Sequence, residues 1–268
     1  MPIIKKLKAN PRMLIDENLC LSKDSHADYT SLISILRFGS TSKTTLDNRH
    51  AQTNEYLSKL DFLGKKPRVL DIGASDGITS LNLMRTLAFK FDKFYITDFN
   101  LEAVYTKRNG FYYLFNSNTG ECVFIFNEIM AFKPNISKAI HRLFLGTIQK
   151  LQKEYKTLDK VTLLHPEVVA ITKENKNIEV FQYDIFKEWA GEKVDIIKVA
   201  NLLNRVYFSD EQITKAIENT KKALKNNGIL CITHNMDKEY ASIYKLTDDK
   251  LTLVHQINGG VIVQDLVS

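Results

Sequence analysis

A β-strand, a glycine-rich turn and an amphipathic helix follow one another over residues 68–88, and this order constrains the fold more than any other part of the sequence. The segment 68–72, with apolar residues at 69, 70 and 72, has the length of a buried strand. The turn 73–77 follows it directly. The next segment repeats apolar residues at helical spacing, namely Ile78, Leu81, Met84 and Ala88. A unit of this kind is typical of α/β folds, in which helices cover a mostly parallel sheet.

Strands and helices alternate again further along the chain. We expect further strands at 94–97, 178–183, 194–200 and 229–233. One helix should open at Pro166, and another at the capping-box pair Ser209 and Gln212, ending at 227–228. The segments 251–254 and 260–263 read as a final antiparallel pair. The sequence therefore predicts a mostly parallel sheet with an antiparallel end pair.

Two stretches do not fit this alternation. Residues 1–65 show helical spacing without a run of alternating β-branched residues, which predicts an N-terminal helical cap. Residues 101–160 predict a hairpin, with strands at 112–115 and 122–126, followed by an amphipathic helix. We treat 101–160 as an ordered insertion in a domain of residues 66–268. Together with the cap, it is expected to cover the binding pocket for the substrate.

Composition limits the cellular setting and the partners. The three cysteines, Cys20, Cys122 and Cys231, are widely spaced, so we expect no disulfide framework, zinc ribbon or other metal site. No run approaches the ~18 apolar residues of a membrane span, and the N-terminus lacks the apolar core of a signal peptide. A cytoplasmic protein with no membrane partner is expected. The net charge of +6 would suit a nucleic acid, but the lysines are spread along the chain, so a nucleic acid is not the favoured partner.

The turn at 73–77 is compatible with three kinds of site. A dinucleotide fingerprint needs a third glycine at a spacing that this segment lacks. A hydrolase elbow, G-x-S-x-G, fits the letters and would make Ser75 a nucleophile. The residues before the first strand offer no oxyanion loop for that reaction, which disfavours a hydrolase. The third kind of site binds an adenosyl cofactor.

The segment 69–77 resembles motif I of class I S-adenosylmethionine-dependent methyltransferases, in which an acidic residue is followed by G-x-G-x-G. Ser75 stands where this family usually has its middle glycine. The resemblance implies a Rossmann-like class I methyltransferase sheet and S-adenosyl-L-methionine as the cofactor. It places Asp71 near the amino-acid end of the cofactor, with Gly73 and Gly77 shaping the turn. Ala74 and Ser75 are expected to bind the cofactor as well.

Later landmarks follow the order of the same family. The resemblance implies that Asp98, at the end of the second strand, accepts hydrogen bonds from the ribose hydroxyls. Asp184 would receive the adenine amino group, with Ile185 beside the ring, and Ala200 would lie on the cofactor side of the fourth strand. Residues 223–230 are similar to the family segment L-K-P-G-G-x-L. An alternative second strand at 161–164 would offer His165 in the place of the ribose acid.

The segment after the fourth strand faces the methyl acceptor in this family. It lacks the N-P-P-Y pattern, and it gives Asn201, Asn204 and Tyr207 as candidates for substrate binding. His165 and His234, at the predicted carboxyl ends of strands, are candidates for a catalytic base. We therefore expect methyl transfer to a small molecule, such as a sugar or a secondary metabolite. An RNA methyltransferase and a non-catalytic cofactor-binding or scaffold protein are the alternatives.

Lys198 interrupts an apolar strand that we place at the centre of the sheet. Central parallel strands are covered on both faces, so a lysine there is expected to be buried and paired. In the strand order of the family, the neighbouring strand carries Asp71. The sequence predicts that Lys198 pairs with Asp71 or with a nearby acid.

Overall fold

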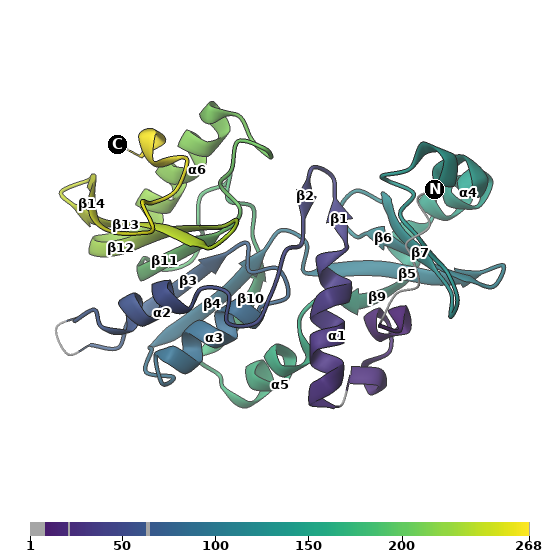
Figure 1. The fold of residues 1–268 in the computed structure, drawn as a ribbon, viewed down its shortest axis with the longest axis horizontal. Coiled ribbons are helices and arrows are strands. Elements are labelled where there is room, and N and C mark those ends of the chain that lie inside the picture. The colour runs from purple at the N-terminus through teal and green to yellow at the C-terminus, as the bar shows by residue number, and fades with distance from the viewer. Residues whose placement is uncertain (1–8, 21, 63–64, 268) are drawn as a thin grey trace. The chain divides into compact units, whose positions relative to one another are not determined.

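The chain folds into two units, and each unit is assembled from two separate stretches of sequence (Figure 1). The computed structural model describes residues 9–20, 22–62 and 65–267. Unit 1 contains the described residues up to Thr45 together with Asn100–Val169, and unit 2 contains Leu46–Phe99 and the described residues from Ala170 onward. The predicted domain boundaries, a cap at 1–65 and an insertion at 101–160, stay predictions, and residues 1–8 lie outside the described part.

A seven-stranded sheet forms the centre of unit 2. Its strands, from one edge to the other, are β10 (Ile178–Gln182), β4 (Lys93–Asp98), β3 (Arg68–Ile72), β11 (Val194–Ala200), β12 (Leu224–Asn235), β13 (Glu239–Thr247) and β14 (Lys250–Ile257). The first five run parallel, and β13 and β14 are antiparallel additions. The strand order reverses between β3 and β11, which is where open α/β sheets bind ligands. The predicted Rossmann-like α/β fold class is confirmed.

Helices cover both faces of this sheet. The helices of unit 2 are α2 (Ala51–Ser58), α3 (Ile78–Thr86), α6 (Asp210–Ala223) and the short η4 (Gln264–Leu266), and α5 (Pro166–Glu174) begins in unit 1 and ends in unit 2. Figure 1 shows α6 on one side of the sheet, with α2 and α3 on the other. The predicted capping box is present, because Ser209 and Gln212 bond each other's backbone N–H at the start of α6. The α6 face of the sheet carries a large apolar core.

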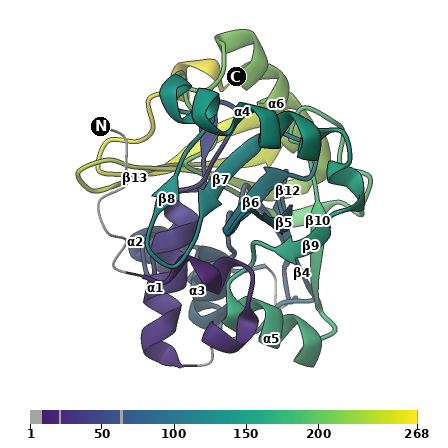
Figure 2. The same cartoon turned by 90° about the vertical axis from the view of Figure 1, so that its right-hand side faces the viewer.

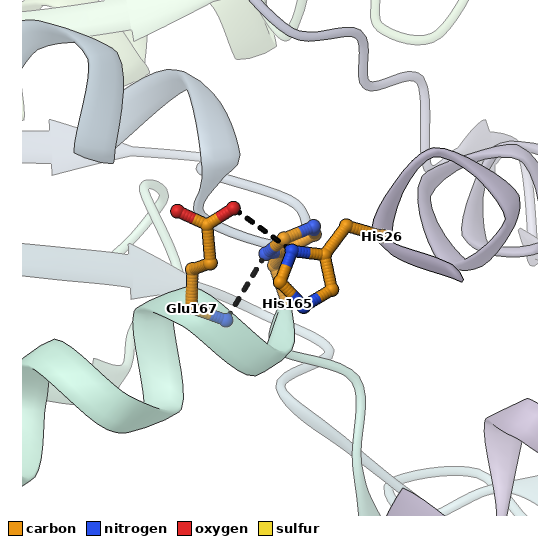
Figure 3. A group of neighbouring side chains, drawn as sticks. All are labelled: His26, His165 and Glu167. Atoms are coloured by element: carbon orange, nitrogen blue, oxygen red, sulfur yellow. Dashed lines mark hydrogen bonds and ion pairs between the residues drawn. The ribbon is translucent and has the colours of Figure 1, made fainter. Parts of the chain in front are cut away.

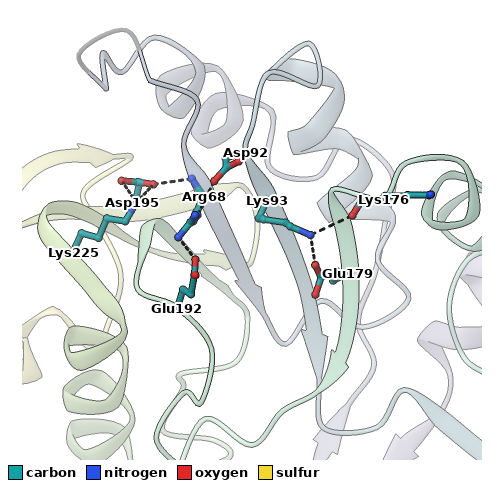
Figure 4. A network of polar contacts seen from close by, with 8 residues as sticks. All are labelled: Arg68, Asp92, Lys93, Lys176, Glu179, Glu192, Asp195 and Lys225. Atoms are coloured by element: carbon teal, nitrogen blue, oxygen red, sulfur yellow. Dashed lines mark hydrogen bonds and ion pairs between the residues drawn. The ribbon is translucent and has the colours of Figure 1, made fainter.

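A polar network ties together strands β3, β4, β10 and β11 near their amino ends (Figure 4). The Arg68 side chain contacts Asp92 at 2.7 Å and also pairs with Glu192, while its backbone N–H donates to Asp195. Lys225 adds a second contact to Asp195 at 2.8 Å. A further pair joins β4 to β10, between Lys93 and Glu179. These residues are exposed or partly exposed, so we expect the ion pairs to add little stability.

Unit 1 is built on a second, five-stranded sheet in which every neighbouring pair is antiparallel. The strand order is β8 (Ala131–Phe132), β7 (Cys122–Phe126), β6 (Phe111–Asn116), β5 (Glu102–Arg108) and β9 (Asp159–Thr162). The helix α1 (Lys23–Ser34) and the turns η1 (Pro11–Leu14) and η2 (Glu17–Cys20) border one face. The helix α4 (Lys138–Gln152) and the turn η3 (Tyr155–Thr157) border the other (Figure 2). A two-stranded ribbon, β1 (Arg37–Phe38) with β2 (Thr41–Ser42), completes the unit.

Several sequence-based expectations about elements were right and others were wrong. The hairpin of β6 and β7 and the helix α4 are confirmed. The alternative second strand is wrong, because β9 pairs with β5 in unit 1 while β4 lies beside β3 in unit 2. The final antiparallel pair is formed by β13 and β14, and residues 260–263 are not a strand. The helix α6 ends at Ala223, and Asn227, with φ of 65°, lies inside β12 where the register shifts.

Candidate functional site

The turn after β3 has a backbone geometry that lets a ligand approach the main chain closely. Gly73 and Gly77 adopt φ of 75° and 81°, a region that glycine enters without the steric cost of a side chain. The N–H groups of Gly73 and Ala74 both donate to the Thr97 carbonyl oxygen on β4, each at 2.9 Å. A Cβ on Gly73 would lie 3.0 Å from the Leu202 side chain. Glycine is therefore required at Gly73 for two reasons, the φ value and the space.

Ser75 and Asp98 join the turn to the end of the second strand. The Ser75 N–H donates to Asp98 Oδ2 at 2.8 Å. Ser75 has φ of 61°, which is uncommon for a residue with a side chain. Glycine is the residue that adopts this conformation at the least steric cost. The structure thus brings the predicted turn residues and the predicted ribose acid together.

Asp71 is fully buried beneath the turn. Its Oδ2 accepts a hydrogen bond from the Ser80 hydroxyl of α3 at 2.7 Å, while Oδ1 has no partner among the described residues. Burial raises the pKa of Asp71 above its usual range, and the nearby positive charge of Lys198 opposes that shift. The predicted contact of Asp71 with the cofactor stays a prediction.

Asp184 and Ile185 follow the edge strand β10. Asp184 Oδ1 accepts the backbone N–H of Phe186 at 3.0 Å, and the Ile185 side chain is buried in the core on the α6 face. Asp184 also lines a cavity of about 650 Å³. The aromatic residues that line this cavity are Tyr95, Phe99, Phe181, Tyr183 and Trp189. Sequence reasoning missed this aromatic lining, although Trp189, the only tryptophan in the chain, was a visible signal.

The segment after β11 is bonded to the end of β12 and then forms a local turn. Ala200 ends the strand, and Asn201, with φ of 54°, donates its N–H to the Thr233 carbonyl oxygen at 2.8 Å. Asn201 Oδ1 accepts the N–H of Asn235 at 2.7 Å. The two predicted substrate residues beyond it, Asn204 and Tyr207, share one turn, in which the Tyr207 N–H donates to the Asn204 carbonyl oxygen at 2.9 Å. The predicted roles of Asn201, Asn204 and Tyr207 in substrate binding stay predictions.

The two histidine candidates lie in different units. His234, near the end of β12, is buried, and its Nε2 lies 2.6 Å from the Leu203 carbonyl oxygen, to which it donates. Burial lowers the pKa of His234, so the neutral ring is favoured near pH 7, with Nδ1 as the acceptor. His165 belongs to unit 1, where its Nδ1 accepts the N–H of Glu167 at 3.2 Å. The structure therefore does not bring His165 and His234 into one group.

Comparisons with known proteins give distant structural likenesses. No protein-family model and no curated protein matches the chain. The chain is similar to an O-methyltransferase family protein from Burkholderia thailandensis at 10% identity, with 85% of this chain and 46% of that chain covered and a TM-score of 0.39. It is similar to the N-methyltransferase NodS from Bradyrhizobium japonicum, solved with S-adenosyl-L-homocysteine, at 16% identity, 70% and 62% coverage and a TM-score of 0.36.

A third similar structure is the YcgJ protein from Bacillus subtilis, at 18% identity, 69% and 51% coverage and a TM-score of 0.36. The chain spans between 46% and 62% of the length of these three structures. Within the described residues, no helix is both long and apolar enough to cross a membrane.

Proposed function

We propose that this chain is an S-adenosylmethionine-dependent methyltransferase that acts on a small molecule. The observation that carries the proposal is the hydrogen bond from the Ser75 N–H to Asp98 Oδ2, at 2.8 Å. It joins a turn of left-handed residues to a carboxylate at the carboxyl edge of a parallel sheet, beside the point where the strand order reverses. An acid at this position is suited to a ribose diol, and the turn admits close approach by a ligand.

The residues of unit 2 fit an adenosyl cofactor in their chemistry. Asp98 would accept the ribose hydroxyls, and Asp184 would accept the adenine amino group at the rim of the aromatic cavity. The unpartnered Oδ1 of Asp71 is an acceptor for a donor near the turn. When bound, S-adenosylmethionine supplies an electrophilic methyl group, which leaves its sulfonium sulfur as the acceptor atom bonds to it.

The acceptor must lose a proton if its reacting atom is a hydroxyl. Neutral His234 is a proposed base, because its Nε2–H is held by the Leu203 carbonyl oxygen and its Nδ1 lone pair is able to take a proton. His165 is the second proposed base. Asn201, Asn204 and Tyr207 are proposed to contact the acceptor. The proposed location is the cytoplasm, because three buried, unpaired thiols fit a reducing compartment.

The test is calorimetric titration of the full chain with S-adenosylmethionine. We expect saturable binding that Asp98→Ala weakens by about 1.5 to 3 kcal/mol, the range for hydrogen bonds to a charged group. The matched control is Asp92→Ala, which removes an aspartate just before β4, at the opposite end of the strand, and should leave the affinity unchanged. Failure of the wild type to bind would overturn the proposal in favour of a scaffold role.

The acceptor class needs a separate measurement. Incubation with methyl-labelled donor, with small-molecule and RNA fractions kept apart, should label the small-molecule fraction only. Label in the RNA fraction alone would replace this acceptor class with the alternative, an RNA methyltransferase.

A further inference from the structure

Two histidines and a glutamate from distant parts of the sequence meet within unit 1 (Figure 3). His26 lies in the first turn of α1, whereas His165 and Glu167 lie at the start of α5. The potential ligand atoms of the three side chains all lie within 4.8 Å of one another. We propose that these three residues form a site for a divalent transition metal ion, and that zinc is the ion that suits them best.

The His26 ring lies between two oxygen atoms, one on each of its nitrogens. Its Nδ1 lies 2.9 Å from Glu167 Oε1, and its Nε2 lies 3.2 Å from the Cys20 carbonyl oxygen. Both partners are acceptors, and a neutral imidazole has only one N–H to donate. A proton shared between Nδ1 and Oε1, or a metal ion bound to both atoms, completes this contact. With zinc at Nδ1, the Nε2–H still donates to the Cys20 carbonyl oxygen, which is the usual outer contact of a metal-bound histidine.

His165 supplies a second nitrogen ligand. Its Nδ1 acts as an acceptor, because the contact at 3.2 Å comes from the Glu167 backbone N–H. An accepting nitrogen carries a lone pair, which a metal ion can take in exchange for this long hydrogen bond. The His165 ring is held in place by burial and by edge-on packing against His26, with ring centroids 4.9 Å apart.

The ligand set and the spacing favour zinc. Two imidazoles and one carboxylate are a known zinc set, which leaves one position for water. Bonds of about 2.0 to 2.1 Å place neighbouring ligand atoms about 3.3 Å apart in a tetrahedral site. To bind zinc, His26 Nδ1 and Glu167 Oε1, now 2.9 Å apart, must separate slightly, and the ligand atom of His165 must move slightly toward them. The His26 and Glu167 side chains are 18% and 32% exposed, so the ion has a path from solvent.

The proposed ion would cross-link the first turn of α1 to the first turn of α5. These elements are far apart in sequence, since 141 positions separate His26 from Glu167. The site lies wholly in unit 1, and zinc binding is measured with no methyl donor present, so its outcome does not depend on the proposed methyl transfer.

The test is titration of the full chain, free of any histidine tag, with Zn²⁺ in a calorimeter, followed by Co²⁺ substitution and absorption spectroscopy. We expect a single Zn²⁺ per chain and a Co²⁺ spectrum of low coordination number. His26→Gln and Glu167→Gln should each weaken binding at least about tenfold, because each removes a ligand. His141→Gln, in helix α4 of the same unit, is the matched control and should bind like the wild type.

The pH dependence gives a second readout. Zinc binds imidazole ligands only through a deprotonated nitrogen, so the affinity should fall as the pH is lowered from about 7.5 to about 6. Equal zinc affinity in the wild type and in both ligand variants, each folded by circular dichroism, would overturn the proposal. Failure of the wild type to bind Zn²⁺ would do the same, and the cluster would then be a hydrogen-bonded ion pair between α1 and α5.

Discussion

Lys198 lies directly beside Asp71 on the neighbouring parallel strand, and both side chains are fully buried. Neither Lys198 Nζ nor Asp71 Oδ1 has a hydrogen-bond partner in the part of the chain that the structure describes. The predicted burial of Lys198 and its position next to Asp71 are confirmed, but the described contacts include no direct ion pair between them. The positive charge of Lys198 opposes the rise in the pKa of Asp71 through the low-dielectric core.

Lys198→Met should destabilise unit 2 by about 1 to 3 kcal/mol near pH 7, because it leaves the Asp71 carboxylate without its compensating charge. The loss should grow as the pH rises, since the variant raises the folded-state pKa of Asp71 further above the unfolded value. Urea unfolding at several pH values measures this loss. The double variant with Asp71→Asn should recover most of the stability, and an unchanged single variant would show that the two charges do not interact.

His50 gives the protein a dependence on pH near neutrality. Burial lowers its pKa well below 6.5, and the charges of Lys198 and Arg49 lower it further. In the unfolded chain His50 therefore binds a proton at a higher pH than in the folded chain, so stability should fall as the pH drops below about 6.5. One such histidine contributes up to about 1.4 kcal/mol per pH unit.

Urea unfolding of the wild type and of His50→Asn, between about pH 5.5 and about pH 7.5, measures the contribution of His50. The variant should show a shallower slope. His234, whose pKa is also lowered by burial, should account for part of the remaining slope. Parallel slopes for the two proteins would mean that the pKa of His50 is the same in the folded and the unfolded chain.

Gly73→Ala should cost about 1 to 2 kcal/mol of stability from the left-handed backbone alone, and more from the contact with Leu202. It should also weaken binding of S-adenosylmethionine. Gly110→Ala is a matched control, because Gly110 has φ of 78° with no atom within 4 Å of an added Cβ. In thermal unfolding, Gly73→Ala should be less stable than Gly110→Ala. An equal loss of stability in the two variants would mean that Leu202 moves aside at no cost.

Ser75 separates the methyltransferase from the hydrolase. Its contact with Asp98 is made by the backbone N–H, so Ser75→Ala should leave cofactor affinity nearly unchanged. Ser75→Gly should raise stability by up to about 1 kcal/mol, because glycine relieves the strain of φ near 61°. Titration with S-adenosylmethionine and thermal unfolding check both variants. An esterase activity that disappears in Ser75→Ala would instead identify a nucleophile.

The sequence predicts those parts of the fold that local signals determine. The capping box at Ser209 depends only on neighbouring residues, and so does the strand Arg68–Ile72 with the turn that begins at Gly73. Both form as expected. The pairing of strands is harder to predict from sequence. For example, β5 pairs with β9, and no residue pattern in the long segment between them indicates this pairing. The contact between His26 and Glu167 was missed for the same reason, because neither residue lies in a recognisable motif.

The division of each unit into two stretches has a consequence for synthesis. A chain that leaves the ribosome presents β3 and β4 before their outer partners β10 and β11 exist, while all five strands of the sheet in unit 1 follow in one continuous stretch. Unit 1 is therefore complete in the nascent chain while the sheet of unit 2 still has two unsatisfied edges. Such edges attract other strands, so early closure of unit 1 shortens the chain's search for β10 and β11 by looping out residues 100–169.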